Sequence, residues 1–241
     1  MSDDANRSKN GASVEATVKA ATGAIVAAAG AFNPVAGMAL GAAKEYIDTP
    51  ILRLIEAERA RRTSRAQQAL QVGSREANQS LDRLVHTIET SPDLLALMSE
   101  TVQAAMATPL EEKIVALGKC LGRGVRDEAT VDAERLRVRG LAGIEAPEVK
   151  LVEVLAEDTH SMPEGGVQER WPGWRRPEIL AELPGFALVL DASIARLTAE
   201  GIVKDDGVGR FGGGGEDREM WVLTDFGKSC LSLLQAVVPS S

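Results

Sequence analysis

The most constraining feature of this 241-residue chain is a run of 24 uncharged residues, Ala20 to Ala43, enclosed by Lys19 and Lys44. A transmembrane helix needs roughly 20 apolar residues, so this run is long enough to span a bilayer. Eleven of the 24 residues are Ala and four are Gly, however, and Asn33-Pro34 lies at the centre. Because proline restricts the residue before it and removes a backbone donor, we expect two short helices, 14–32 and 35–47, joined as a hairpin.

This apolar hairpin, residues 14–47, admits two interpretations. Small residues recur in it at a spacing of four, which lets helices approach closely in water or in lipid. The favoured interpretation is packing within a helical bundle, and the alternative is entry into a membrane. Either contact would use the large apolar residues Ile25, Val26, Phe32, Val35, Met38 and Leu40. The polar residues 1–13 indicate a disordered tail, and the acidic pair Asp3-Asp4 disfavours a cleaved signal peptide.

Residues 50–72 are predicted to form a long polar helix. Proline occupies the first position, as is typical of a helix start, and five arginines lie within residues 53–65. We expect a solvated helix with pairs such as Glu58 and Arg62, which are four residues apart, and an end at Gly73-Ser74. The alternative is a basic flank that contacts anionic lipid or nucleic acid beside the hairpin.

Residues 75–145 show helical apolar periods in close succession, separated by short breaks, which is typical of a helical bundle. Aromatic residues make up only 3% of the chain, which favours helices packed through small residues. Gly118 lies within one apolar period and predicts a close approach by a neighbouring helix, and Gly122 and Gly124 are expected to end its own helix. The side chains expected in the core include Leu84, Leu94, Leu95, Leu97, Leu117, Leu121, Leu136 and Leu141.

The C-terminal part, residues 147–241, has a different order of elements. Three helices are expected first, at 148–157, 177–183 and 186–200. A glycine-rich run then separates two strands, and Thr224 caps a last helix. Helix, helix, helix, hairpin, helix is the order of a winged-helix domain. The third helix is expected to face the core through Leu188, Leu190, Ile194 and Leu197, and Gly201 to end it in the left-handed conformation.

We therefore predict a mainly α fold, with an N-terminal helical hairpin and bundle followed by a winged-helix domain with a small β-hairpin wing. The predicted divisions are a tail at 1–13, a helical region at 14–146 and a winged-helix-like domain at 147–241. The formal net charge is -8, and residues 148–241 hold 9 Lys and Arg against 16 Asp and Glu. The acidity therefore belongs to the C-terminal domain.

DNA binding is the function that a winged helix suggests, and the sequence disfavours it here. A DNA-binding domain normally presents a basic stripe that contacts several phosphates. An acidic domain instead repels a phosphate backbone. If the domain did bind DNA, the contacts would come from Arg196, Lys204, Arg210 and Arg218.

The residues needed for most enzyme chemistries are missing from the sequence. There are two cysteines and two histidines, without the spacing of a zinc site. The run Gly212 to Gly215 is followed by Glu216-Asp217 and not by the Lys-Ser/Thr of a phosphate-binding loop. We therefore expect no catalytic residue, no cofactor and no metal ion.

One loop combines aromatic and basic side chains that are common at protein interfaces. Its residues either fasten the loop onto the domain or contact a partner: Trp171, Trp174, Arg175 and Arg176.

Two stretches of the C-terminal domain resemble a known family. Residues 197–203, LTAEGIV, and 222–228, VLTDFGK, are similar to the winged-helix ends of many bacterial proteins. Together with the small-residue N-terminus and the helical middle, the chain resembles the abortive-infection alpha (Abi-alpha) family of bacterial and prophage proteins. That resemblance implies a role in phage exclusion and no catalytic residues.

The expected function is thus that of a non-enzymatic bacterial cytoplasmic protein of abortive-infection type. We expect it to act through contacts with a protein partner or with itself as a homo-oligomer, and to associate with a membrane if the hairpin enters lipid. Two alternatives remain: a winged-helix DNA-binding regulator with a helical dimerisation region, and a membrane-active effector that uses the hairpin.

Overall fold

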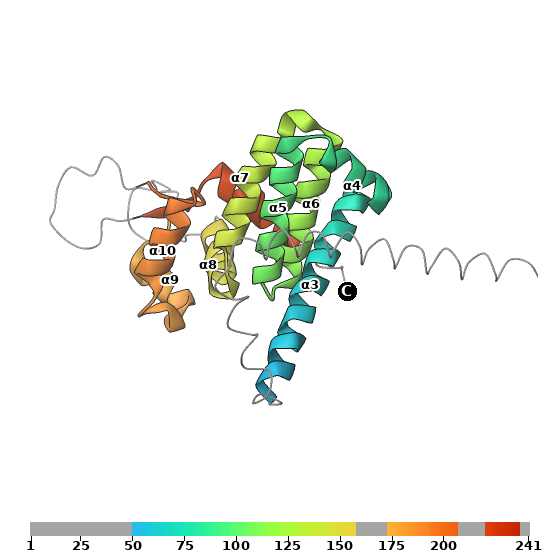
Figure 1. The fold of residues 1–241 in the computed structure, drawn as a ribbon. Coiled ribbons are helices and arrows are strands. Elements are labelled where there is room, and N and C mark those ends of the chain that lie inside the picture. The colour runs from blue at the N-terminus through green and yellow to red at the C-terminus, as the bar shows by residue number, and fades with distance from the viewer. Residues whose placement is uncertain (1–49, 158–172, 207–219, 237–241) are drawn as a thin grey trace, which may run out of the picture.

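The computed structural model describes residues 50–157, 173–206 and 220–236, and it is mainly helical with one small antiparallel sheet (Figure 1). This agrees with the mainly α fold expected from the sequence. The predicted tail at 1–13, the apolar hairpin at 14–47 and the glycine-rich run lie outside the described residues. Within the described part, none of the helices has the length and apolar character of a membrane-crossing segment.

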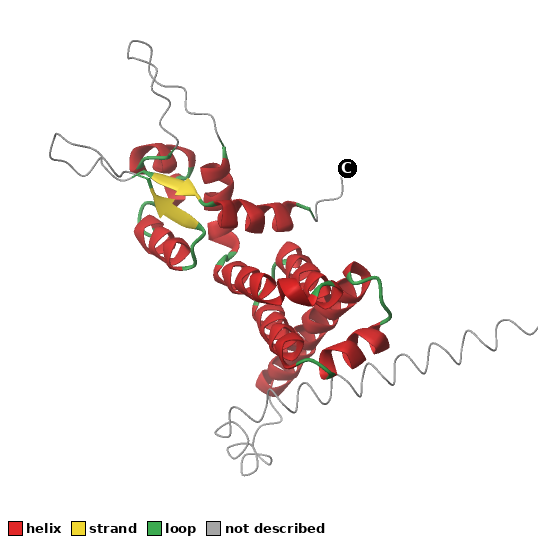
Figure 2. Cartoon of the chain, turned by 90° about the horizontal axis from the view of Figure 1, so that it is seen from above, coloured by secondary structure: helices red, strands yellow, loops and turns green. Residues whose placement is uncertain are grey.

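The first five described helices form a bundle. They are α3 (Pro50–Glu76), α4 (Leu81–Glu89), α5 (Pro92–Ala107), α6 (Glu111–Arg126) and α7 (Val131–Gly143). Helix α6 lies at the centre and contacts α3, α5 and α7 (Figures 1 and 2). Leu117 and Leu121 of α6 are fully buried, together with Leu94 and Leu97 of α5. Most of the leucines expected in the core therefore lie there.

The contact between α3 and α6 depends on glycine. A Cβ atom added to Gly118 would lie 2.5 Å from the carbonyl oxygen of Ala69, and one added to Gly122 would lie 2.6 Å from that of Gly73. The close approach predicted at Gly118 is confirmed. The helix ends predicted nearby are wrong, because α3 continues through Gly73 to Glu76 and α6 continues through Gly122 to Arg126. These glycines provide room for the neighbouring backbone and do not interrupt their helices.

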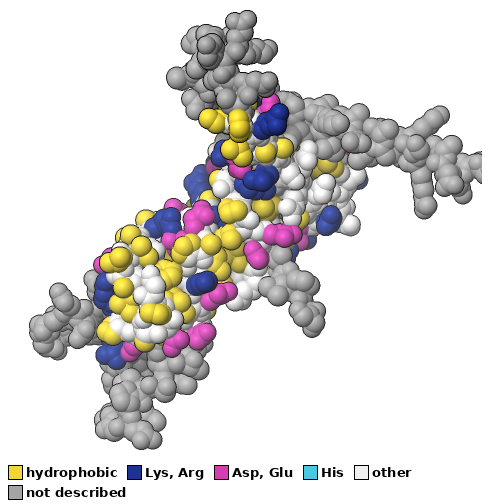
Figure 3. Space-filling model, turned by 90° about the horizontal axis from the view of Figure 1, so that it is seen from below, with side chains coloured by type: hydrophobic (Ala, Val, Ile, Leu, Met, Phe, Trp, Pro, Cys, Tyr) yellow, Lys and Arg dark blue, Asp and Glu magenta, His cyan; other side chains and the backbone are white. Residues whose placement is uncertain are grey.

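Helix α3 extends well beyond the bundle. Its first residue with a buried side chain is Ala66, and residues 50–62, here called the α3 overhang, project past the lower ends of α5 and α6 (Figure 1). Ile51, Leu54 and Ile55 of the overhang are 61%, 68% and 44% exposed. In a view from below, hydrophobic side chains gather over the C-terminal unit and again over the first turns of α3 (Figure 3).

The remaining elements form a C-terminal unit. They are α8 (Ala146–Ala156), α9 (Arg176–Glu182), the 3-10 turn η2 (Pro184–Phe186), α10 (Leu190–Ala199), β1 (Val203–Asp205), β2 (Trp221–Leu223) and α11 (Asp225–Gln235). The strands pair antiparallel, with Val203 opposite Leu223 and Asp205 opposite Trp221. Helix α11 then returns to contact α6 and α7, which joins the unit to the bundle.

Local signals in the sequence placed several element ends correctly. Ser91 and Thr224 cap α5 and α11, and the Thr224 hydroxyl accepts the Gly227 amide proton at 2.9 Å. Gly201 has a φ of 71° directly after α10, as expected for a left-handed helix end. The predicted helix at 186–200 begins later, at Leu190, because Pro184 starts a 3-10 turn before it.

Three leucines expected in the core are exposed instead. Leu188 is 98% exposed, because it lies in the turn between η2 and α10 and not within a helix. Leu136 of α7 is 56% exposed, since the buried face of α7 includes the carboxylate side chain of Glu134. Leu95 of α5 is half-exposed, because its neighbours Leu94 and Leu97 occupy the inner face.

Candidate functional site

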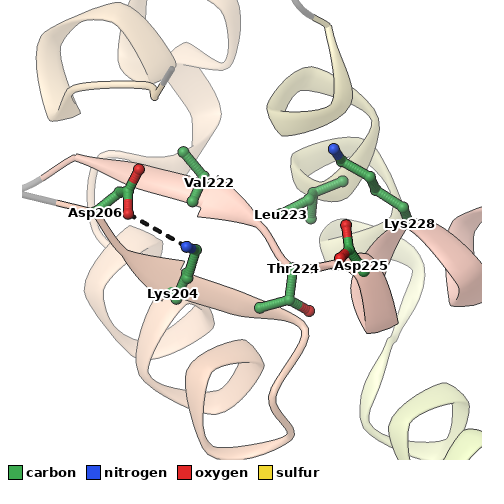
Figure 4. Close-up of a pocket in the computed structure, with 7 residues that line it drawn as sticks. All are labelled: Lys204, Asp206, Val222, Leu223, Thr224, Asp225 and Lys228. Carbon is green, nitrogen blue, oxygen red and sulfur yellow. Dashed lines mark hydrogen bonds and ion pairs between the residues drawn. The ribbon is translucent and has the colours of Figure 1, made fainter. Parts of the chain in front are cut away.

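The sheet and the start of α11 line a shallow cleft of about 400 Å³. Lys204 and Asp206 approach it from one side and are joined at 3.2 Å, while Asp225 and Lys228 lie on the first turn of α11 (Figure 4). Two carboxylates and two amines thus face the same small volume. An anionic ligand would meet both carboxylates, so this cleft does not have the charge of a phosphate site.

Thr224 also lines this cleft. Its hydroxyl donates to the carbonyl oxygen of Gly201 at 2.7 Å and accepts from the amide of Gly227 at 2.9 Å. It therefore joins the turn after α10 to the first turn of α11. No group of three or more metal-ligating side chains occurs within residues 50–157, 173–206 and 220–236.

The aromatic and basic loop residues bind mostly to their own domain. Trp174 is buried, its indole Nε1 donates to the carbonyl oxygen of Glu157 at 3.3 Å, and its backbone pairs with that of Trp221. This burial contradicts the hypothesis that Trp174 is an exposed partner contact. Trp171 lies outside the described residues.

The two arginines that follow Trp174 are half-exposed and form local ion pairs. The Arg175 guanidinium contacts the carboxylate of Glu178 at 3.0 Å, one turn further along α9. Arg176 pairs with Asp191 of α10, so it connects α9 to α10. Both arginines leave part of the guanidinium open to solvent, and their role as partner contacts stays a prediction.

The four residues considered for DNA contact do not form a cationic surface in the described part. Arg196 forms an ion pair with Glu148, whose carboxylate is buried, and Lys204 pairs with Asp206. Arg210 and Arg218 lie outside the described residues. The two cations that the structure places are therefore neutralised by neighbouring carboxylates.

Glu148 of α8 belongs to a polar cluster inside the C-terminal unit. Besides Arg196, its carboxylate accepts from the Ser193 hydroxyl at 3.1 Å and from the Glu145 amide at 3.2 Å. These contacts bind α8 to α10 and at the same time cap the start of α8. Sequence patterns missed this residue, because a glutamate in the first turn of a helix is normally exposed.

Lys113 of α6 lies beside the connection from α7 to α8, with its side chain almost entirely buried. Its Nζ donates to the carbonyl oxygens of Ala142 and Ile144 at 2.9 and 2.7 Å, and it contacts the Glu145 carboxylate at 3.3 Å. It therefore satisfies carbonyl groups at the end of α7. Burial lowers the pKa of Lys113 below its ordinary value, and the neighbouring Glu145 carboxylate opposes that shift.

A third buried group lies where α6, α7 and α11 meet. The Glu134 carboxylate pairs with Arg137, whose Nε donates to the Ser229 hydroxyl at 3.3 Å. Cys120 and Cys230 are both fully buried there as free thiols. Burial raises the pKa of the Cys230 thiol to about 12 and also raises the pKa of Cys120, next to the Glu134 carboxylate. Both thiols stay protonated at neutral pH, which suits core residues and not nucleophiles.

The start of α10 exposes apolar side chains. Leu188 and Val189 precede α10 directly, and Val189 is 45% exposed. The neighbouring residues from Leu183 to Leu190 include no charged side chain. The sequence did not point to this surface, because Leu188 fits the apolar period of the predicted helix.

The fold and these sites define a mainly helical protein with a small antiparallel sheet in its C-terminal unit. No family model, curated protein or solved structure matches the chain.

Proposed function

We propose that the C-terminal unit is a winged-helix domain used for protein contacts, in a non-enzymatic, cytoplasmic bacterial protein of abortive-infection type. The order α8, α9, α10, β1, β2, α11 supports the domain assignment. The backbone bridge between Trp174 and Trp221 adds a third extended segment beside β2, between α8 and α9. A short segment at that position is typical of winged-helix domains.

The observation that best supports a protein contact is the exposed apolar surface at the start of α10. In a winged helix that reads DNA, this helix enters the groove and presents cations and polar groups. Here the exposed side chains are Leu188 and Val189, and the one arginine of α10 is paired with Glu148. An exposed apolar patch with few free cations suits a protein partner and repels neither neutral nor basic surfaces.

The resemblance of residues 197–203 and 222–228 to Abi-alpha proteins connects this contact with phage exclusion. In this proposal the protein recognises a phage or host protein, or a second copy of itself, through its C-terminal unit. The contacts of α11 with α6 and α7, and that of Lys113 with Glu145 just before α8, support a fixed connection between that unit and the bundle, as an adaptor requires.

The test compares two exposed leucines. Leu188→Asp is expected to lower phage restriction in a plating assay, while Leu136→Asp, on the exposed face of α7, retains it. Both proteins should keep the melting temperature of the wild type, because neither side chain is buried. Equal restriction by the two variants would contradict the proposal.

Binding of DNA is measured on the same proteins by fluorescence anisotropy at low salt. The proposal expects no binding to random or genomic duplexes. Binding that weakens steeply with salt, as phosphate contacts do, and that is lost in Arg196→Ala and Lys204→Ala, would favour the DNA-binding regulator instead.

A further inference from the structure

The α3 overhang presents an apolar face that is in line with the face α3 uses inside the bundle. Ile51 precedes Ala69 by 18 residues and Ile55 precedes Gly73 by 18 residues. Eighteen residues make about five turns of an α-helix, so each pair points in nearly the same direction. Ala69 and Gly73 are buried against α6. Ile51 and Ile55 therefore face the region that lies in line with α6, beyond its first residue.

The bundle ends before it reaches these two side chains. Arg65 donates to the carbonyl oxygen of Met106, at the end of α5, and Gln68 donates to the Glu111 carboxylate, at the start of α6. The parallel register of α3 and α6, with Gly118 beside Ala69 and Gly122 beside Gly73, places the first residue of α6 level with about residue 62 of α3. The 13 residues of the overhang extend about 20 Å further, at about 1.5 Å per residue, and their apolar face is exposed.

We propose that this face of the overhang is the docking surface for residues 20–43 of the same chain, which continue the bundle beyond α5 and α6. The helix predicted at 35–47 is connected to Pro50 by residues 48–49. A connection of two residues is at the short end of the usual range of about 2–8 for neighbouring antiparallel helices. The inference does not depend on the proposed function.

The chemistry of residues 20–43 fits this surface. The segment is uncharged, so packing it against Ile51, Leu54 and Ile55 buries no charged group. It is rich in Ala and Gly, and α3 already packs against α6 through such residues, as the contacts at Gly118 and Gly122 show. Val35, Met38 and Leu40 supply the larger apolar side chains for the contact.

A second copy of the protein fits the observations less well. A stable interface between two chains buries roughly 1,200–2,000 Å², and the exposed apolar face comprises only about two helical turns. A tethered segment meets the same face at an effective concentration that reaches millimolar values for short linkers. The small area is therefore sufficient for residues 20–43 and insufficient for a separate molecule.

Thiol labelling of the full chain tests the proposal. Both native cysteines are fully buried, so we expect neither to react with a maleimide under native conditions. Ile51→Cys and Leu136→Cys replace side chains with similar exposed fractions, 61% and 56%. If residues 20–43 cover the overhang, Ile51→Cys reacts at least about tenfold more slowly than Leu136→Cys, because labelling then requires local opening. Each rate is normalised to the rate measured in denaturant.

A second substitution identifies what covers the overhang. Adding Met38→Asp and Leu40→Asp should raise the labelling rate of Ile51→Cys to that of Leu136→Cys and leave the latter unchanged. Equal rates without these substitutions would overturn the proposal, and so would slow labelling that persists with them. Slow labelling that depends on protein concentration would indicate a second copy, and slow labelling only with anionic vesicles would indicate a lipid surface; either result would also overturn it.

An independent measurement does not rely on the aspartate variants folding well. Oxidation of the Leu40→Cys, Ile55→Cys double variant with copper phenanthroline should give an intrachain disulfide at low protein concentration. The Leu40→Cys, Leu136→Cys pair should give none. Equal disulfide yields from the two pairs would contradict docking on the overhang.

Discussion

The contact between α3 and α6 and the polar contacts around α8 are built from opposite kinds of residue. The first depends on glycines that let two backbones approach, with Gly118 and Gly122 against Ala69 and Gly73. The second depends on buried charged side chains, chiefly Glu148 and Lys113, that satisfy hydrogen bonds across several elements. Each contact thus tolerates a different kind of change.

The difference has a physical basis. Glycine contacts stabilise by close packing over a long helix face and leave no room for an added atom. Buried charges contribute little net stability when paired, and they destabilise strongly when one partner is removed. We therefore expect the α3–α6 contact to be sensitive to added volume and the contacts around α8 to be sensitive to lost charge.

The largest effect is expected from Gly118→Ala. The added Cβ would lie 2.5 Å from the Ala69 carbonyl oxygen and 2.7 Å from the Cβ of Val72, so α3 and α6 must separate. We expect the free energy of unfolding to fall by about 3 kcal/mol, the upper range for overpacking. Urea unfolding followed by circular dichroism measures this.

Gly185→Ala is the matched control for Gly118→Ala. No atom lies within 4 Å of the position its Cβ would take. Its free energy of unfolding should stay within about 0.5 kcal/mol of the wild-type value. Equal losses in the two variants would show that close approach does not limit the α3–α6 contact.

Glu148→Ala is expected to have the second largest effect. It removes the acceptor for Ser193, Arg196 and the Glu145 amide, and the Ser193 side chain is buried. A loss of about 2 kcal/mol in the free energy of unfolding is expected for a buried polar group left without a partner. Glu148→Gln, which retains an acceptor oxygen and the shape, should lose less. If both variants match the wild type, the Glu148 carboxylate does not hold α8 and α10 together.

The difference between glycine contacts and buried charged contacts also explains which parts of the structure the sequence predicted. Gly118 was predicted as a close approach because its apolar helical period was visible, and caps such as Ser91 and Thr224 depend only on neighbouring residues. The burial of Glu148, Lys113 and Glu134 was not predicted, since polar residues in a helix are normally exposed. Lys113 binds the carbonyl oxygens of residues 29 and 31 positions away, and Glu148 binds Ser193, 45 positions away. Long-range pairing of polar groups leaves no local pattern.

The candidate site shows the same limit. The short helices and the hairpin of the C-terminal unit were predictable from local signals, whereas the exposure of Leu188 was not. It depends on the Pro184 turn, which delays the start of α10 to Leu190. Similarly, the pairing of Arg196 with Glu148 required the fold to bring α8 and α10 together.

The third prediction concerns pH and tests whether water is excluded from the Cys230 thiol, which is buried where α6, α7 and α11 meet. The pKa of Cys230 is raised to about 12 from its ordinary value of 9.0, so above pH 9 the unfolded chain loses a proton that the native protein retains. Stability must therefore fall as pH rises above 9, by up to about 1.4 kcal/mol per pH unit for this thiol. The stabilisation of the wild type relative to Cys230→Ala should shrink accordingly between pH 9 and pH 10.5.

Urea unfolding at several pH values measures this difference. Ser232→Ala, at an exposed position on the same helix, retains the thiol and should show the same pH dependence as the wild type. A constant difference between wild type and Cys230→Ala across this range would mean that water reaches the thiol in the native protein.

The smallest effect is expected from the ion pair between Arg176 and Asp191, which sharpens the contrast with Glu148. Both pairs connect neighbouring helices of the C-terminal unit, but the Asp191 side chain is 73% exposed and that of Glu148 only 4%. Exposed ion pairs contribute about 0.5 kcal/mol, because water solvates the separated charges almost as well. Asp191→Asn should therefore change the free energy of unfolding by about 0.5 kcal/mol or less, and the change should vanish at high salt. If Asp191→Asn instead costs as much as Glu148→Ala, burial does not distinguish the two pairs, and charge alone would hold the helices of this unit together.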